Sequence, residues 1–329
     1  MTVHRAGALL LGLVAALALL APLVAPHHVA EQFADRAYAP PMRIHVRDGN
    51  GFRAPFVYRQ VLEDRLLRRY RDDTSLAVPI RWGRNWQLAS IPAEYGPLLL
   101  FGADALGRDV FSRLVHGARL SLGVTMVGVA GALLIGFVVG GFAGSLGGRT
   151  DTWLMLIADF ILVLPGAYLV LVLRGVLPLV LTTGQVFWMM AALFALAAWP
   201  HVARGVRAIV ATERQRDYAE AIRAAGAGSF RLVAQLLPAA RGFALVEVIL
   251  LVPALLVAEA TVSFLGLGFL EPSASWGMML QEAANVRVMA EAPWMLLPAV
   301  ALFVVVLGTQ LLGWARSSAA ELLLADRRR

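Results

Sequence analysis

The sequence contains no cysteine and no lysine among its 329 residues, so all 29 basic residues are arginines. Without cysteine there is no disulfide, no thiolate zinc ligand and no cysteine nucleophile. Without lysine there is no phosphate-binding loop of the G-x-x-x-x-G-K-[ST] type and no Schiff-base lysine. These absences exclude disulfide scaffolds, thiolate enzymes and that class of nucleotide-binding domain.

Charge is also scarce. Only 16% of the residues are charged and 59% are hydrophobic, whereas soluble domains average about 25% charged and about 45–50% apolar residues. The mean hydropathy is +0.70. The formal charge of +7 therefore indicates arginines placed beside a lipid bilayer rather than a nucleic-acid-binding surface.

Six apolar segments are long enough to cross a bilayer, which takes about 20 residues. They cover residues 6–23, 120–143, 152–173, 185–206, 242–262 and 293–315. The sequence therefore predicts an all-α membrane protein with six transmembrane helices. The first segment follows Arg5 and is longer than a usual signal-peptide core. We expect it to be a retained anchor, with a cleaved signal peptide as the alternative.

Arginines in the short connections predict the orientation of these helices. Thirteen arginines fall on one set of ends and only Arg174 and Arg287 on the other. The thirteen include seven within residues 204–241 and three at the extreme C-terminus. Both termini are therefore expected in the cytoplasm, with residues 27–119 outside the cell membrane.

The outer segment shows short alternating patterns. Met42, Ile44 and Val46 alternate with polar residues, which predicts a strand followed by a turn at 48–51. A return strand is expected at 54–61 and further strands at 77–82 and 86–91, while the charged stretch 63–73 is expected to be helical. We predict a small β-rich extracytoplasmic insertion between helices one and two.

The cytoplasmic loop between the fourth and fifth spans is the most informative stretch. Thr212 and Gln215 fit a capping box at the start of an alanine-rich helix. Gly226 can end that helix in a left-handed conformation. A second short helix is expected at 229–237, ending at Pro238.

Two interpretations fit this loop. It is either a surface segment that follows the positive-inside rule or a docking element for another protein. Apolar and small side chains recur at helical spacing, so one face can bury area against a partner. They are Tyr218, Ala221, Ile222 and Ala225.

Ionisable residues inside the spans need protein or water around them. Asp159 in the third span is either a pathway residue or one member of an interhelical ion pair. Glu259, near the outer end of the fifth span, serves either helix packing and gating or substrate contact. The second span is rich in glycine, which allows close helix approach either at a pore interface or in simple packing.

Several motifs resemble those of bacterial ABC importer permeases. Glu220, Ala221 and Gly226 match the E-A-A-x-x-x-G motif, with Ile222 at the second alanine position, and Leu237-Pro238 follows. Residues 101–113, F-G-A-D-A-L-G-R-D-V-F-S-R, resemble the G-T-D-x-x-G-R-D segment of the dipeptide, oligopeptide and nickel permeases. Residues 258–268, A-E-A-T-V-S-F-L-G-L-G, are similar to another motif of that group. They match the C-type member of its permease pair.

The resemblance implies one half of a heterodimeric pore that imports short peptides, with nickel or another small solute as the alternative. The implied partners are a second permease, two ATP-binding subunits, an extracytoplasmic solute-binding protein and the lipid bilayer, with no nucleic acid. The ATPase-coupling residues would be Tyr218, Glu220, Ala221, Ile222, Gly226, Leu237 and Pro238. The pore or gating candidates are Asp159, Glu259 and Gly266. No catalytic residue, metal or cofactor is expected.

The expected domain plan has four parts. An anchor at 1–26 precedes an extracytoplasmic insertion and pre-helix segment at 27–118. A permease core at 119–316 contains the coupling loop 211–240, and a basic cytoplasmic tail occupies 317–329. The expected location is the bacterial inner membrane. An ion-driven secondary transporter and an intramembrane enzyme remain as alternatives, although the H-E-x-x-H and G-x-S-x-G motifs are absent.

Overall fold

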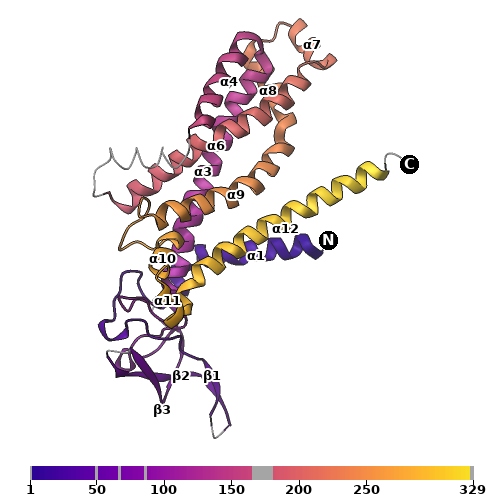
Figure 1. The fold of residues 1–329 in the computed structure, drawn as a ribbon. Coiled ribbons are helices and arrows are strands. Elements are labelled where there is room, and N and C mark those ends of the chain that lie inside the picture. Colours follow the sequence, from indigo (N-terminus) through magenta and orange to yellow (C-terminus); the bar gives the residue numbers. More distant parts are fainter. Residues whose placement is uncertain (1, 49–50, 66–67, 85–86, 165–180, 327–329) are drawn as a thin grey trace. The chain divides into compact units, whose positions relative to one another are not determined.

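The structure is a computed structural model that describes residues 2–48, 51–65, 68–84, 87–164 and 181–326. The chain divides into two compact units. The first comprises Met1–Ala8, Gly123–Glu259 and Val306–Arg329, and the second comprises Leu9–Leu122 and Ala260–Val305. Each unit is described separately below, and Figure 1 gives the element labels.

The described chain is mostly helical. Its long helices are α1 (Thr2–Leu19), α3 (Val110–Leu146), α4 (Gly148–Val163), α6 (Thr183–Glu213), α9 (Arg241–Phe264) and α12 (Leu297–Asp326). Among the described residues, four segments have the length and hydropathy of membrane spans: Val110–Leu146, Thr183–Glu213, Ser229–Phe264 and Pro293–Trp314. The expected first span overlaps the shorter apolar helix α1, which ends at Leu19. The expected third span overlaps α4, and its residues from 165 onward lie outside the described part of the chain.

In the first unit, α3 and α6 lie in very close contact through a stripe of glycines on α3. A Cβ atom added at Gly136 would lie 2.5 Å from the Val202 Cβ atom, and one at Gly140 would lie 2.4 Å from the Ala203 carbonyl oxygen. Gly144 is equally close to α6, 2.7 Å from the Arg207 carbonyl oxygen. The glycines recur every four residues, as in small-residue contacts between membrane helices. The glycine-rich span therefore packs within its own chain.

The sheets belong to the second unit. Strands β1 (His45–Asp48), β2 (Gly51–Asp64) and β3 (Arg69–Pro79) form an antiparallel sheet in the order β1-β2-β3. Strands β4 (Arg81–Arg84) and β5 (Gln87–Ser90) form a separate antiparallel pair. Val57 and Val78, from β2 and β3, are buried in a small core together with Leu98 and Leu99.

The helix expected at 63–73 is wrong, because this stretch contains the ends of two paired strands. Leu62 lies opposite Tyr70 and Val61 opposite Arg71 in the β2-β3 ladder. Tyr70 packs against the core and its hydroxyl donates a hydrogen bond to the Ala37 carbonyl at 2.9 Å. Pairing along the whole hairpin outweighs the local helical preference of its charged residues.

The remaining elements are short. Near the N-terminus they are α2 (Ala21–Val24), η1 (Ala34–Arg36) and η2 (Ala93–Tyr95). The loop between α6 and α9 contains α7 (Asp217–Ala224), α8 (Ser229–Leu236) and η3 (Leu237–Ala240), and α10 (Trp276–Ala283), α11 (Val286–Glu291) and η4 (Pro293–Leu296) precede α12.

A buried ionic cluster lies just before α3 in the second unit. Asp104 is 1% exposed and Arg108 is 3% exposed, and their side chains meet with an Arg108 Nε to Asp104 Oδ2 distance of 2.6 Å. Asp104 also accepts hydrogen bonds from the backbone N–H groups of Leu106 and Arg108, both at 2.9 Å. Arg108 binds Glu271 through both terminal nitrogens. The cluster thus ties the segment before α3 to the loop after α9.

Two further carboxylates complete this region. Asp109 caps α3, because its Oδ2 accepts hydrogen bonds from the Ser112 N–H at 3.0 Å and the Ser112 hydroxyl at 2.5 Å. Glu282 accepts a hydrogen bond from the Ala105 N–H at 2.7 Å. Burial, together with the nearby Asp104 carboxylate, raises the pKa of Glu282. Arg108 and Asp109 are therefore both occupied by contacts within the second unit.

The α3–α6 contact predicts a clear difference between two glycine substitutions. Gly140→Ala places a methyl group against a backbone carbonyl that no rotamer change can move, so it should cost about 1–3 kcal/mol. Gly184→Ala, on α6, meets no atom within 4 Å and should leave stability nearly unchanged. Thermal unfolding of the two variants in nanodiscs measures this, and equal melting temperatures would contradict the packing described here.

The buried cluster predicts a second contrast. Asp104→Ala leaves Arg108 without its fully buried carboxylate partner, which should cost about 3–5 kcal/mol. Asp35→Ala removes an exposed pair, in which Arg65 and Asp35 are 82% and 74% exposed, and should cost about 0–1 kcal/mol. The same unfolding assay compares them. A loss for Asp35→Ala as large as that for Asp104→Ala would show that burial does not decide the effect.

Candidate functional site: the loop between α6 and α9

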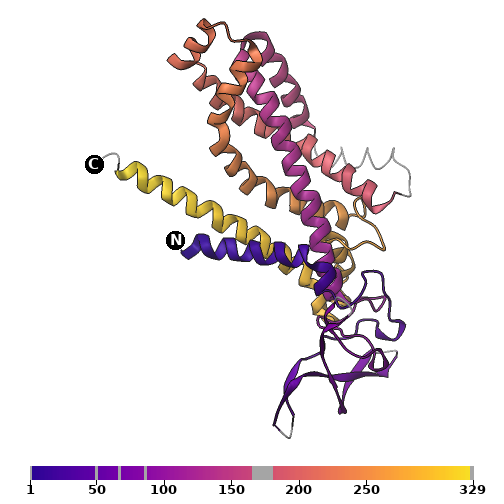
Figure 2. The ribbon, with the colours of Figure 1, turned by 180° about the vertical axis from the view of Figure 1, so that it is seen from behind.

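The candidate site is the pair of short helices α7 and α8 in the first unit. Both views show these helices beside the ends of α3 and α4 (Figure 1, Figure 2). The predicted capping box at Thr212 is wrong, because α6 continues to Glu213 and the Thr212 hydroxyl donates to the Ala208 carbonyl at 3.0 Å. Good helix formers around Thr212 extend α6, so the next helix begins only at Asp217.

Gly226 ends α7 as predicted, with a φ of +77°. The Gly226 N–H donates to the Arg223 carbonyl at 2.9 Å, and the Ala227 N–H donates to the Ile222 carbonyl at 3.3 Å. These two bonds form a Schellman motif, in which a left-handed residue closes the last helical turn. An added Cβ at Gly226 would meet no atom within 4 Å. The need for glycine here is therefore conformational and not steric.

Helix α7 has two different faces. Tyr218, Ala221 and Ala225 lie within about 60° of one another around the helix axis, since successive residues are about 100° apart. All three are exposed, and the neighbouring Ile222 is half-buried. Glu220 lies on roughly the opposite face. The apolar face expected to dock a partner is thus uncovered in the isolated chain.

The Tyr218 side chain is also fixed by a hydrogen bond to the end of α6. Its hydroxyl donates a hydrogen bond to Glu213 Oε2 at 2.8 Å. Partial desolvation, together with this bond to a carboxylate, raises the pKa of Tyr218 above its ordinary value. Tyr218 as a whole remains 42% exposed, so its hydroxyl is held in place while the residue still presents surface to a partner.

Helix α8 packs the loop between α6 and α9 against the long apolar helices. Leu232, Val233 and Leu236 are buried on one side of it, whereas Phe230 on the other side is 77% exposed. An added Cβ at Gly141 of α3 would lie 3.0 Å from Leu237 Cδ1. Pro238 is exposed within η3, and its carbonyl accepts a hydrogen bond from Arg241 Nε at 3.2 Å. Helix α8 and η3 therefore both pack against α3.

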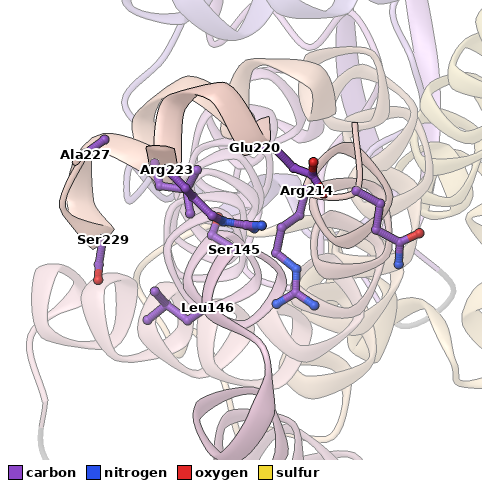
Figure 3. Close-up of a pocket in the computed structure, with 9 residues that line it drawn as sticks. Ser145, Leu146, Arg214, Glu220, Arg223, Ala227 and Ser229 are labelled. Carbon is purple, nitrogen blue, oxygen red and sulfur yellow. The ribbon is translucent and has the colours of Figure 1, made fainter. Parts of the chain in front are cut away.

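A polar hollow of about 500 Å³ lies against the Glu220 face of α7. Its lining residues are Ser145, Leu146, Arg214, Gln215, Glu220, Arg223, Ala227, Ser229 and Leu232. Figure 3 shows the Arg223 side chain reaching across the hollow above Ser145. The structure thus places Glu220 in this hollow and away from the exposed apolar face.

The structure places the three pore or gating candidates in different settings. Asp159 of α4 forms an ion pair with Arg204 of α6, which is the structural alternative considered for it. Glu259 is fully buried, and it is the last residue of the segment Gly123–Glu259 of the first unit. Gly266, in the second unit, ends α9 with a φ of +73° and two hydrogen bonds of the same Schellman pattern as Gly226.

Sequence reasoning missed a second ion pair between α4 and α6. Arg207 Nε donates to Asp151 Oδ1 at 2.8 Å, and Arg207 Nη2 donates to Asp151 Oδ2 at 2.5 Å. It also missed the hollow, since Ser145 is about 70 residues from Arg214 along the chain. The available signal for the two pairs was the presence of aspartates in one apolar span and arginines in another. This signal does not show which helices are neighbours.

Comparison with known proteins identifies the family. The profile of the family described as "Binding-protein-dependent transport system inner membrane component" matches residues 136–317. The nickel transport system permease protein NikC of Escherichia coli K12 is 38% identical over 213 residues, which are 64% of this chain and 74% of NikC. The chain belongs to this family.

Two relatives from Bacillus subtilis extend the comparison. The dipeptide transport system permease protein DppC is 40% identical over 186 residues, 55% of each chain. The oligopeptide transport system permease protein OppC is 38% identical over 200 residues, 60% of this chain and 62% of OppC. The protein is thus a permease subunit of a binding-protein-dependent importer, a multi-pass inner-membrane protein and a transport component rather than an enzyme.

The Gly226 turn predicts opposite results for one substitution at two nearby positions. Gly226→Ser forces a side chain into a left-handed backbone, which costs about 1–2 kcal/mol. Gly228→Ser is tolerated, because Gly228 is the N-cap of α8 with a φ of −68° and serine is favoured there. Hydrogen exchange of α7 amides should accelerate about five- to thirtyfold in Gly226→Ser only. Unchanged protection in Gly226→Ser would contradict the assigned role.

Proposed function

We propose that this permease imports short peptides and receives the energy for transport through the exposed face of α7. The observation that carries the proposal is an uncovered apolar face on a short helix, whose neighbour α8 buries one side against the membrane helices. Such a face stabilises a complex when a partner covers it. The peptide substrate is supported by DppC and OppC, whose names state dipeptide and oligopeptide transport.

In this mechanism, two ATP-binding subunits dock below the membrane and contact Tyr218, Ala221 and Ile222. ATP-driven closure of the ATPase pair moves α7 and α8 as one body, because the Gly226 turn fixes the angle between them. Leu237 and Pro238 transmit the displacement toward α9 and, through Gly141, toward α3. The membrane helices then change between inward-facing and outward-facing states. Glu220 acts from the opposite face of α7, where it lines the hollow.

The proposed topology has six spans, with both termini in the cytoplasm and the sheets outside. The anchor (1–26), insertion (27–118), core (119–316) and tail (317–329) keep their expected roles. A second permease completes the pore, and a solute-binding protein delivers substrate from outside. Glu259 and Gly266 are proposed to act at the outer gate, while Asp159 acts through its ion pair with Arg204 and without substrate contact.

Nickel import is the second candidate, because NikC is as similar to this chain as the peptide permeases are. Transport assays separate the two substrates. Uptake of a labelled dipeptide and of nickel ions by the reconstituted importer, each with its binding protein, shows which one depends on this chain. Uptake of nickel without peptide uptake would overturn the peptide assignment and leave the permease function intact.

The docking face predicts the effect of a single charge. Ala221→Asp places a carboxylate on the exposed apolar face of α7, where a docked subunit would desolvate it. Recovery of the ATP-binding subunits with the tagged chain should fall at least about tenfold. Ala234→Asp adds the same charge to an exposed site on α8 and should leave recovery within about twofold.

The substrate-stimulated ATPase activity of the purified complexes gives an independent readout. It should fall in parallel with ATPase recovery in Ala221→Asp and remain unchanged in Ala234→Asp. Full recovery and full activity with Ala221→Asp would refute the docking surface assigned to α7.

A further inference from the structure

The hollow behind α7 contains two guanidinium groups without carboxylate partners. Arg214 and Arg223 both line it, and among the described residues neither forms an ion pair, whereas the adjacent Arg216 pairs with Glu213 at 3.1 Å. The one carboxylate in the hollow belongs to Glu220. The two arginines therefore outweigh it and leave the lining with a net positive charge.

A buried hydroxyl in the same hollow also has no partner. Ser145 is 2% exposed, and its Oγ atom makes no hydrogen bond in the described structure. A buried hydroxyl without a partner costs free energy, so a polar ligand beside Ser145 would remove that cost. Ser145 lines the hollow at the end of α3, and its hydroxyl is the buried polar group there that lacks a partner.

Two further features suit an anion. Helix α8 begins at Ser229, which lines the hollow, and its N-cap Gly228 provides no side-chain cap. The N–H groups of a first helical turn favour negative charge. Arg214 lies close to the turn between α3 and α4. A Cβ atom added at Gly147 in this turn would be only 2.0 Å from Arg214 Nη1. The absence of a side chain at Gly147 therefore leaves room for the Arg214 guanidinium.

We propose that this hollow binds a phosphate group. Two guanidinium groups, a serine hydroxyl and the first turn of a helix are the donors by which proteins hold phosphate. Glu220 moderates the affinity, because its carboxylate repels a bound anion. The hollow lies where α3 and α6, both of membrane-spanning length, come to an end. The phosphate therefore comes either from an anionic phospholipid headgroup or from inorganic phosphate in solution.

The position of the site gives it a consequence for α7. Glu220 and Arg223 face the hollow, while Tyr218 and Ala221 face the opposite way. A phosphate held between Arg223 of α7 and Ser145 of α3 would link the two helices from behind. It would do so without covering the face proposed for the ATP-binding subunits. Occupancy would therefore stiffen the coupling loop rather than compete with docking.

Binding can be measured on the full-length chain in nanodiscs, without ATP or substrate, so the result does not depend on transport. For the lipid source, native mass spectrometry compares retention of phosphatidylglycerol with that of phosphatidylcholine. For the free source, calorimetry titrates inorganic phosphate into phosphatidylcholine nanodiscs at constant ionic strength. We expect saturable binding at one site from one of these sources.

Three matched variants assign the binding to the hollow. Arg214→Gln and Arg223→Gln should each weaken binding about tenfold, because each removes a charge-assisted hydrogen bond. Arg231→Gln removes the same charge from an exposed position on α8 outside the hollow and should change affinity less than about twofold. Equal losses in all three variants would show general electrostatic attraction and would overturn the proposal.

Ser145→Ala gives a test that misfolding cannot mimic. It removes a buried hydroxyl without a partner, so the ligand-free variant should melt at the same temperature as the parent or higher. Phosphate or phosphatidylglycerol binding should nevertheless weaken several-fold. Unchanged binding in Ser145→Ala, or no binding from either source, overturns the proposal. If Arg214→Gln lowers only the recovery of the ATP-binding subunits, the arginines serve a protein carboxylate instead, and the phosphate site is rejected.

Discussion

The contact between α3 and α6 is the interaction on which the functional half of the chain depends. At Gly136, Gly140 and Gly144 the two helices are too close for any side chain on α3. In a bilayer, where the hydrophobic effect does not drive helices together, such close packing is a main source of helix association. It sets the distance between the end of α3, where the turn to α4 begins, and the end of α6, where the coupling loop begins.

The positions of α7 and α8 follow from that contact. Helix α8 buries Leu232, Val233 and Leu236 and leaves α7 mostly exposed. Because α7 is only eight residues long, it is too short to be stable alone. Its geometry is instead imposed by the Gly226 turn at one end and by the Tyr218–Glu213 hydrogen bond at the other. A short helix that is fixed at both ends and exposed on one face can transmit a displacement from a bound partner.

The sequence alone predicted the local features better than the long-range ones. The left-handed Gly226 turn was predictable, because only glycine adopts that backbone cheaply and α7 must end there. The capping box at Thr212 failed because the helix formers before it extend α6, and the helix at 63–73 failed because strand pairing is decided by distant residues. The glycine stripe was visible in the sequence, yet nothing in it identified α6 as the partner. The hollow was missed for the same reason, since its arginines and Ser145 come from separate helices.

The central claim is that the exposed face of α7 contacts an ATP-binding subunit, and the absence of cysteine permits a direct measurement. Ala221→Cys and Ala234→Cys each introduce the only thiol of this chain, which can be labelled with a photoactivatable maleimide before assembly of the importer. Illumination should join Ala221→Cys to an ATP-binding subunit and leave Ala234→Cys without that product. An intact complex in which Ala221→Cys yields no product with the ATP-binding subunit would contradict the account.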